Sequence, residues 1–225
     1  ENINGALDLT LDSGAGTIAV VGTTTVNNLV ITNSGSAIFT GAVAATTDIT
    51  ITDTTDGTTV SFLDAVTARD LVTFGEDYLV SMTGTGNTFT QEVDFLNTGL
   101  VTIGDETTDT FAFNGGLNFN TGAAGGAASS VAATITATGD ANFGDGGVLL
   151  TDAGALVTTI GGNIIFGENI NGILDLTLDS GAAGTIAVAG ITTVDNLVIT
   201  NSGGAIFTGA VAANTDITIT DTTDG

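Results

Sequence analysis

The two ends of this 225-residue chain carry nearly the same sequence. Residues 1–57 align with residues 168–225 with six substitutions and one inserted alanine, and both copies close on the same ten letters, DITITDTTDG. The sequence therefore divides into one full unit, Glu1–Gly167, and the first third of a second unit. Self-similarity at a fixed period indicates a repeat architecture. We expect a tandem array, in which the residues that follow Gly225 resemble Thr58–Val66.

Apolar and polar residues alternate along most of the chain. The alternation is clearest in four stretches: LDLTL at 7–11, DITIT at 48–52, FAFN at 111–114 and LNFN at 117–120. A period of two in segments rich in β-branched residues predicts strands, and no stretch shows a sustained helical period. Turns rich in Gly, Asn, Asp and Thr separate the strands at intervals of about 7 to 12 residues. The sequence predicts an all-β chain.

The junction between the two units favours a parallel β-helix, or β-solenoid, of stacked short strands. Residues Leu156–Leu178 cross the junction in the same rhythm of strand and turn, with no linker. The chain also has no proline, so nothing blocks backbone pairing from one rung to the next. About 20 residues per rung would give about 11 rungs and a rod about 50 Å long. Tandem β-sandwich domains remain the alternative.

The charge of the chain excludes several partners. Arg69 is the one basic residue against 25 acidic residues, which gives a formal net charge of −24. Nucleic-acid binding and attachment to anionic lipid both need Lys and Arg, so we expect neither partner. No apolar run approaches the roughly 18 residues that span a membrane, so we expect no membrane insertion of this segment. The surface attracts cations, and Arg69 is expected to pair with Asp70 or a neighbouring acid.

Enzymatic activity is not expected, because the residues for it are missing. The chain has no Cys, His or Lys, which excludes disulfides, thiolate zinc sites and most general acid–base groups. Only pairs of carboxylates remain, and these are expected by chance in so acidic a chain. We predict no catalytic residues and no firmly bound cofactor.

Calcium is the one candidate cofactor, because it takes carboxylate and carbonyl oxygens from flexible turns. The competing interpretation is that Asp and Asn favour tight turns through hydrogen bonds to the backbone. The candidate ligands are the acids of DTTDG and of its copy, the cluster in GDETTD, and the polar residues of GDANFGDGG. They are Asp53, Asp56, Asp221, Asp224, Asp105, Glu106, Asp109, Asp140, Asn142 and Asp145.

Threonine is the other recurrent residue type. The stretches TTT at 23–25, TITDTT at 50–55 and TITAT at 134–138 place alternate hydroxyls on one strand face. Stacked in register, such rows could order water as an ice-binding face or carry O-linked sugars. The simpler interpretation is that threonine suits a solvent-facing strand.

The repeated motifs resemble the β-strand repeats of giant bacterial surface proteins of the filamentous-haemagglutinin and autotransporter-adhesin type. Those repeats run GG-x-I-x-F, then L-x-L-x-x-G-x-G-x-I, then G-x-F-x-G-x-V. Here the segments that follow this rhythm are Gly161–Phe166, Leu174–Ile186 and Gly204–Val211, with Leu7–Ile18 and Ser36–Val43 in the first copy, where Ser36 replaces the first glycine. The resemblance thins across Glu76–Ala128. It implies a right-handed parallel β-helix, export to the bacterial cell surface and a structural or adhesive role.

We therefore expect a structural segment of a long, extracellular, acidic filament or adhesin stalk, which acts through length and self-association into filaments or bundles. The alternatives are a ligand- or glycan-binding adhesin region, with cell-surface glycans as partners, and a surface repeat that depends on calcium or binds ice.

Overall fold

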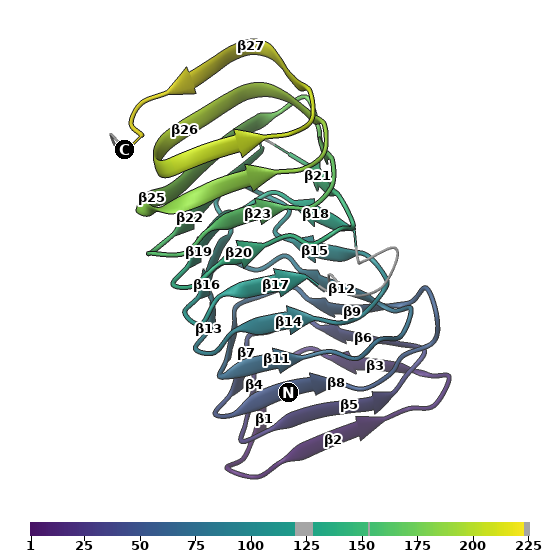
Figure 1. Cartoon of the computed structure of the whole chain (residues 1–225). Coiled ribbons are helices and arrows are strands. Elements are labelled where there is room, and N and C mark those ends of the chain that lie inside the picture. The colour runs from purple at the N-terminus through teal and green to yellow at the C-terminus, as the bar shows by residue number, and fades with distance from the viewer. Residues whose placement is uncertain (120–127, 153, 223–225) are drawn as a thin grey trace.

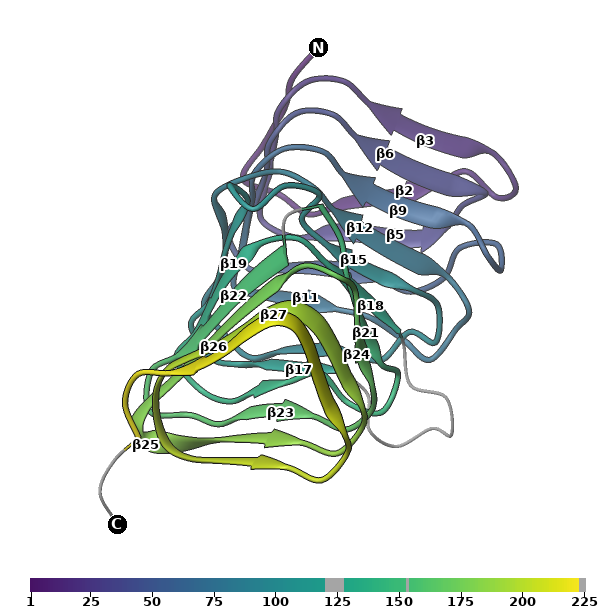
Figure 2. The same cartoon turned by 90° about the horizontal axis from the view of Figure 1, so that it is seen from above.

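The computed structural model describes residues 1–119, 128–152 and 154–222. Throughout this part of the chain the strands pair in parallel and no helix occurs, so the polypeptide winds into a β-solenoid of about ten coils (Figure 1). Up to Asn171 each strand pairs with the third strand before or after it along the chain, apart from the break between the strands Asp70–Val72 and Val93–Phe95, so one coil holds three strands. Seen from above, the coils have a triangular outline (Figure 2). The all-β solenoid predicted from the sequence is confirmed, and the tandem sandwiches are not observed.

The three sides of the triangle are called the first, second and third faces. The first face holds β1 (Ile3–Asn4), β4 (Thr24–Val26), β7 (Val43–Ala45), β10 (Val66–Ala68), β13 (Asn87–Phe89), β16 (Thr110–Phe113), β19 (Thr134–Ala137) and β22 (Gly154–Thr159). The second holds β2 (Leu9–Asp12), β5 (Leu29–Asn33), β8 (Asp48–Ile51), β11 (Asp70–Val72), β14 (Val93–Phe95), β17 (Leu117–Phe119), β20 (Ala141–Asn142) and β23 (Ile164–Phe166). The third holds β3 (Thr17–Val20), β6 (Ser36–Phe39), β9 (Thr59–Phe62), β12 (Leu79–Met82), β15 (Val101–Ile103), β18 (Ser129–Val131), β21 (Val148–Leu150) and β24 (Ile170–Asn171).

The last coils consist of three long, bent strands that turn the corners without a break. They are β25 (Asp175–Val188), β26 (Thr192–Phe207) and β27 (Val211–Ile219). β25 pairs with β22 on the first face and with β23 on the second, so the ladder passes through the junction between the units.

The length of chain in one coil varies along the rod. Thr17 and Ser36 are register partners on neighbouring coils and lie 19 residues apart. The separation is longest between Val101 and Ser129, which are also register partners. Strands β1 to β24 are only two to six residues long, so among the described residues before β25 this variation falls between the strands. The expected rung of about 20 residues is close to the shorter end of the range.

The core is a column of inward-facing side chains that alternate with outward-facing ones. In β6, for example, Ala37 and Phe39 are fully buried while Ser36 and Ile38 are not. Because register is kept, each inward side chain packs against the side chain at the same position one coil away, and at several positions the two are of the same kind. Phe119, Phe143 and Phe166 show this stacking, with ring centroids 5.6 and 4.7 Å apart.

One face has a break in its backbone ladder. β2, β5, β8 and β11 form a sheet of four strands, separate from the sheet of 23 strands that holds the rest. Between β11 and β14 the buried Thr73 hydroxyl donates to the carbonyl of Asp94 at 3.2 Å and accepts from the amide of Leu96 at 2.6 Å. The Thr73 side chain thus joins two strands that have no backbone ladder between them, while in the preceding corner the amide of Gln91 donates to the carbonyl of Arg69 at 2.8 Å.

The second copy is turned about the rod axis relative to the first. Leu9–Leu11 lie on the second face, whereas their equivalents Leu176–Leu178 pair with Ala155–Val157 of β22 on the first face. Over the described strands the offset from β2 to β25 is twenty-three strand positions, which is seven and two-thirds coils. A spacing of about 4.8 Å per coil then advances each unit by about 37 Å and rotates it by one third of a turn.

Replacing Phe143 by Ala should lower the free energy of unfolding by about 3–5 kcal/mol, because it leaves a cavity between two stacked rings. The matched control is Phe74→Ala, since the Phe74 side chain is 44% exposed and its loss should cost below about 1 kcal/mol. Urea unfolding followed by circular dichroism measures both. Equal losses would contradict a core held by the aromatic column.

Candidate functional site

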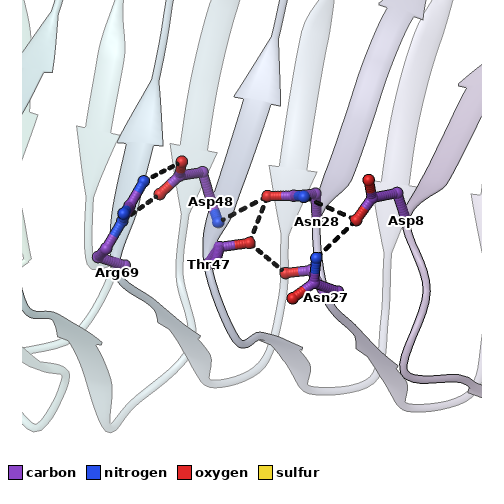
Figure 3. A network of polar contacts seen from close by, with 6 residues as sticks. All are labelled: Asp8, Asn27, Asn28, Thr47, Asp48 and Arg69. Atoms are coloured by element: carbon purple, nitrogen blue, oxygen red, sulfur yellow. Dashed lines mark hydrogen bonds and ion pairs between the residues drawn. The ribbon is translucent and has the colours of Figure 1, made fainter.

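An extended polar network runs along the edge between the first and second faces. We call it the corner ladder (Figure 3), and its members are Asp8, Asn27, Asn28, Thr47, Asp48 and Arg69. Asp48 is the first residue of β8, and the others come from the corners that precede β2, β5, β8 and β11, so the ladder spans four successive coils.

At its N-terminal end, around Asp8, the corner ladder is made of amide and carboxylate groups. The Asp8 Oδ1 atom accepts from the side-chain amides of Asn27 at 2.8 Å and Asn28 at 2.7 Å. These donors hold the pKa of Asp8 below its ordinary value. Asn28 Oδ1 in turn accepts from the Thr47 hydroxyl and from the Asp48 amide at 3.3 Å. Asn28 thus bridges two coils that both carry an acid.

At its C-terminal end the corner ladder carries Arg69, the one basic side chain of the sequence. Arg69 contacts Asp48 through two parallel hydrogen bonds, Nε to Oδ1 at 2.9 Å and Nη2 to Oδ2 at 2.6 Å. The sequence predicts a pair with Asp70 or a neighbouring acid, and the structure selects Asp48 on the preceding coil. Asp48 and Asp70 are register partners on β8 and β11, so two carboxylates lie one strand spacing apart here. The guanidinium offsets their repulsion.

Asp70 is the least well-paired acid of this edge. Its Oδ1 atom is buried and has no hydrogen-bond partner in the described part of the chain. Burial raises the pKa of Asp70, and the charges of Asp48 and Asp94 raise it further, against the opposing effect of Arg69.

The second copy repeats the ladder at a different edge. Asn196 donates to Asp175 at 2.7 Å, as Asn28 does to Asp8, and the Thr215 hydroxyl donates to Asp195 at 3.0 Å. Asp195 replaces Asn27 of the first copy, so Asp175 lacks one of the two side-chain amide donors that Asp8 has. These residues lie between the third and first faces, in keeping with the rotation of the unit by one third of a turn.

Two of the calcium candidates belong to similar ladders on the second face. The Asn142 amide donates to Asn118 at 2.9 Å, and its Oδ1 atom accepts from the backbone of Gly144 at 3.0 Å. Asp140 Oδ1 accepts from the backbone and the side-chain amide of Asn163, at 2.7 and 3.2 Å. Both side chains are therefore engaged in joining coils and closing turns.

The cluster in GDETTD forms a capped turn. The Asp109 carboxylate is buried and accepts from the backbone amides of Asp105 at 3.0 Å and Glu106 at 3.2 Å. Partial desolvation and the adjacent Asp109 carboxyl raise the pKa of Asp105. The three acids thus lie together, and Asp109 stabilises the turn as the competing interpretation of the sequence predicts.

The remaining calcium candidates are isolated. Asp53, Asp56, Asp145 and Asp221 are exposed, and Asp224 lies outside the described residues. Within residues 1–119, 128–152 and 154–222, no group of three or more acidic side chains has a geometry that could hold a metal ion. Calcium binding by any of the ten residues stays a prediction.

The threonine rows do form a column, but it is interrupted. On the outside of the first face Thr25, Thr67, Thr88, Thr136 and Thr158 occupy one register line. Alanines stand in the same line at positions 44 and 112. The column therefore lacks the unbroken row of threonine hydroxyls that an ice-binding face would need.

Two shallow grooves in the surface carry no acid. One, of about 150 Å³, is lined by apolar residues of the second face such as Ile165, Ala187 and Ile206. The other, of about 250 Å³, is lined by Leu100, Leu149 and their neighbours. Neither contains a predicted calcium ligand. No helix among the described residues is long and apolar enough to span a membrane.

Comparison of the chain with family models, curated proteins and solved structures finds no significant match.

Sequence reasoning misses the corner ladder, although a signal for it exists. Asp8, Asn28 and Asp48 recur at a spacing of 20 residues, which is close to the length of one coil. Polar residues at the coil period in a solenoid occupy one edge, because neighbouring coils keep register.

Replacing Asp70 by Asn should make stability less dependent on pH. Because the pKa of Asp70 is raised in the fold, the folded state binds its proton more readily, and this contribution to stability grows as the pH falls through that pKa and is lost as the pH rises. Wild type should therefore gain more stability than the variant between about pH 7 and about pH 4. Urea midpoints at several pH values measure the difference, with Asp56→Asn as the exposed control.

Calcium and magnesium chloride at equal ionic strength should raise the thermal midpoint equally, because both screen the same negative charge. The structure shows turns already closed by hydrogen bonds, which need no ion. A larger shift in calcium that disappears in Asp105→Asn or Asp140→Asn would instead establish a calcium site at that turn.

Proposed function

We propose that the chain is a structural segment of a long, extracellular, acidic rod that serves as a filament or adhesin stalk on a bacterial cell surface. The observation that carries the proposal is the unbroken ladder at the junction of the units. β22 and β23, which precede Glu168, pair directly with β25, which follows it. A second unit is added to the first as further coils of the same rod.

The inside of the rod fits a mechanical role. Each coil contributes buried apolar side chains to one continuous core, and each backbone ladder passes load to the next coil. The exposed carboxylates repel neighbouring rods at low salt and keep a β-rich chain soluble. Self-association into bundles would therefore depend on salt or divalent cations.

The proposed cell-surface location of the rod and its proposed relationship to adhesins rest on the repeat motifs. Their resemblance to filamentous-haemagglutinin and autotransporter-adhesin repeats supports export to the cell surface, and the absence of cysteine from the sequence is compatible with it. The shallow, acid-free grooves favour a stalk over a region that binds glycans or performs catalysis.

A protein with three tandem units should appear in electron micrographs as a single straight rod. Each added unit should lengthen it by about 37 Å, since a coil advances about 4.8 Å. Gold labels attached through Thr25→Cys, and through its equivalent in each unit, should point in three directions one third of a turn apart. Separate globular beads would contradict the rod, and labels on one side would contradict the rotation alone.

A further inference from the structure

Three asparagines of the sequence are followed directly by glycine: Asn4, Asn114 and Asn171. In such a pair the backbone nitrogen of the glycine can attack the side-chain amide carbon of the asparagine, because glycine has no side chain that hinders the approach. The attack requires the backbone between the two residues to rotate toward the asparagine side chain. The fold therefore decides which of the three pairs reacts.

Asn114 lies in a corner, between β16 and β17, and not in a strand. Asn114 and Gly115 are both exposed and form the centre of a turn, which the Gly116 amide closes by donating to the Phe113 carbonyl at 3.1 Å. The peptide group between Asn114 and Gly115 makes no hydrogen bond within the described part of the chain, and neither does the Asn114 side chain. No hydrogen bond among the described residues thus holds the groups that would react.

The other two asparagines lie in paired strands. Asn171 is exposed in β24, which pairs with β21 on one side and with β26 on the other. Asn4 is its equivalent in β1, which pairs with β4. The amide of Gly172, like that of Gly115, has no partner among the described residues, so the two sites differ mainly in the paired strand. Rotation of the backbone at Asn171 requires this strand to open first.

We propose that Asn114 is a site of spontaneous covalent modification, at which water converts the asparagine to aspartate or isoaspartate. The Gly115 nitrogen loses its proton and bonds to the side-chain carbonyl carbon of Asn114, and the side-chain nitrogen leaves with that proton as ammonia. Water then adds across one of the two carbonyl-carbon-to-nitrogen bonds of the resulting five-membered ring. Opening at one bond gives aspartate, and opening at the other gives isoaspartate, whose main chain runs through the former side chain. The reaction needs water alone and does not depend on where the rod is located.

The corner has little room for the longer main chain of isoaspartate. A Cβ atom placed on Gly115 would overlap the backbone of Gln91 and Glu92 on the preceding coil. The Asn114 amide also donates to the Phe89 carbonyl at 2.8 Å, which continues the pairing of β16 with β13. An added methylene between Asn114 and Gly115 would displace one of these contacts. The modification should therefore loosen the corner and add one negative charge to it.

The first test is peptide mass spectrometry of the folded chain after storage in neutral buffer. Asn114 should be converted at least about tenfold faster than Asn171, because the paired strand must open before Asn171 can react. In urea the two residues should react at similar rates, since both precede glycine and neither is held by the fold. Equal rates in the folded chain, or a faster reaction at Asn171, would overturn the proposal.

A matched pair of variants tests the effect on the corner. Asn114→Gln should stop the reaction, because glutamine would have to close a larger ring, and Asn171→Gln is the control. The Asn114 side chain is exposed and makes no hydrogen bond among the described residues, so its replacement should leave the fold intact. Storage should lower the thermal midpoint of wild type and of Asn171→Gln, and should leave that of Asn114→Gln unchanged. An equal decline in all three proteins would overturn the loosening of the corner.

Discussion

The parallel backbone ladder between coils is the interaction on which the rest of the structure depends. Apart from the break between β11 and β14, the strands inside the described stack pair with the strand one coil before and one coil after, as β16 does with β13 and β19. Buried amides and carbonyls must be paired, so the strands keep register and length differences move to the corners. The alanine that is inserted in the second copy falls in such a corner, between Ser180 and Gly184, where the register of β25 and β26 shifts.

Register has a second consequence, because at several positions it stacks side chains of the same kind on one another. For Phe119, Phe143 and Phe166 the stacking is favourable, since the rings bury one another. For acids it is unfavourable, since carboxylates one strand spacing apart repel. The corner ladder resolves this conflict by placing Asn28 between Asp8 and Asp48, and Arg69 beyond Asp48. Asn, Thr and Arg at one edge thus allow an acidic solenoid to stack.

The sequence predicts the strands and their parallel stacking, because these follow from the local alternation of apolar and polar residues. Alternation such as DITIT and the absence of proline lead directly to stacked parallel strands, which are observed. Contacts between coils are harder to predict, because corner lengths vary and each error shifts every later residue. The sequence therefore does not single out Asp48 as the partner of Arg69, although the spacing of 21 residues between them is one coil. Thr73 bridging β11 and β14 has no local signal at all, since many threonines in the chain occupy similar positions.

Nearly identical sequences lie on different faces of this rod, so the sequence specifies the contacts between coils and not the face on which they occur. Leu9 pairs with Leu29 on the second face, and Leu176 pairs with Leu197 on the first, so the contacts between coils are the same while the faces differ. The same sequence is therefore accepted on two different faces, and the rotation of a unit follows from its offset of twenty-three strand positions, which is not a multiple of three. A unit of seven and two-thirds coils returns to the same face after three units, about 110 Å along the rod. In a tandem array, each surface feature of the unit would then point in three directions along the rod. A neighbouring rod on any of the three sides would contact the same residues.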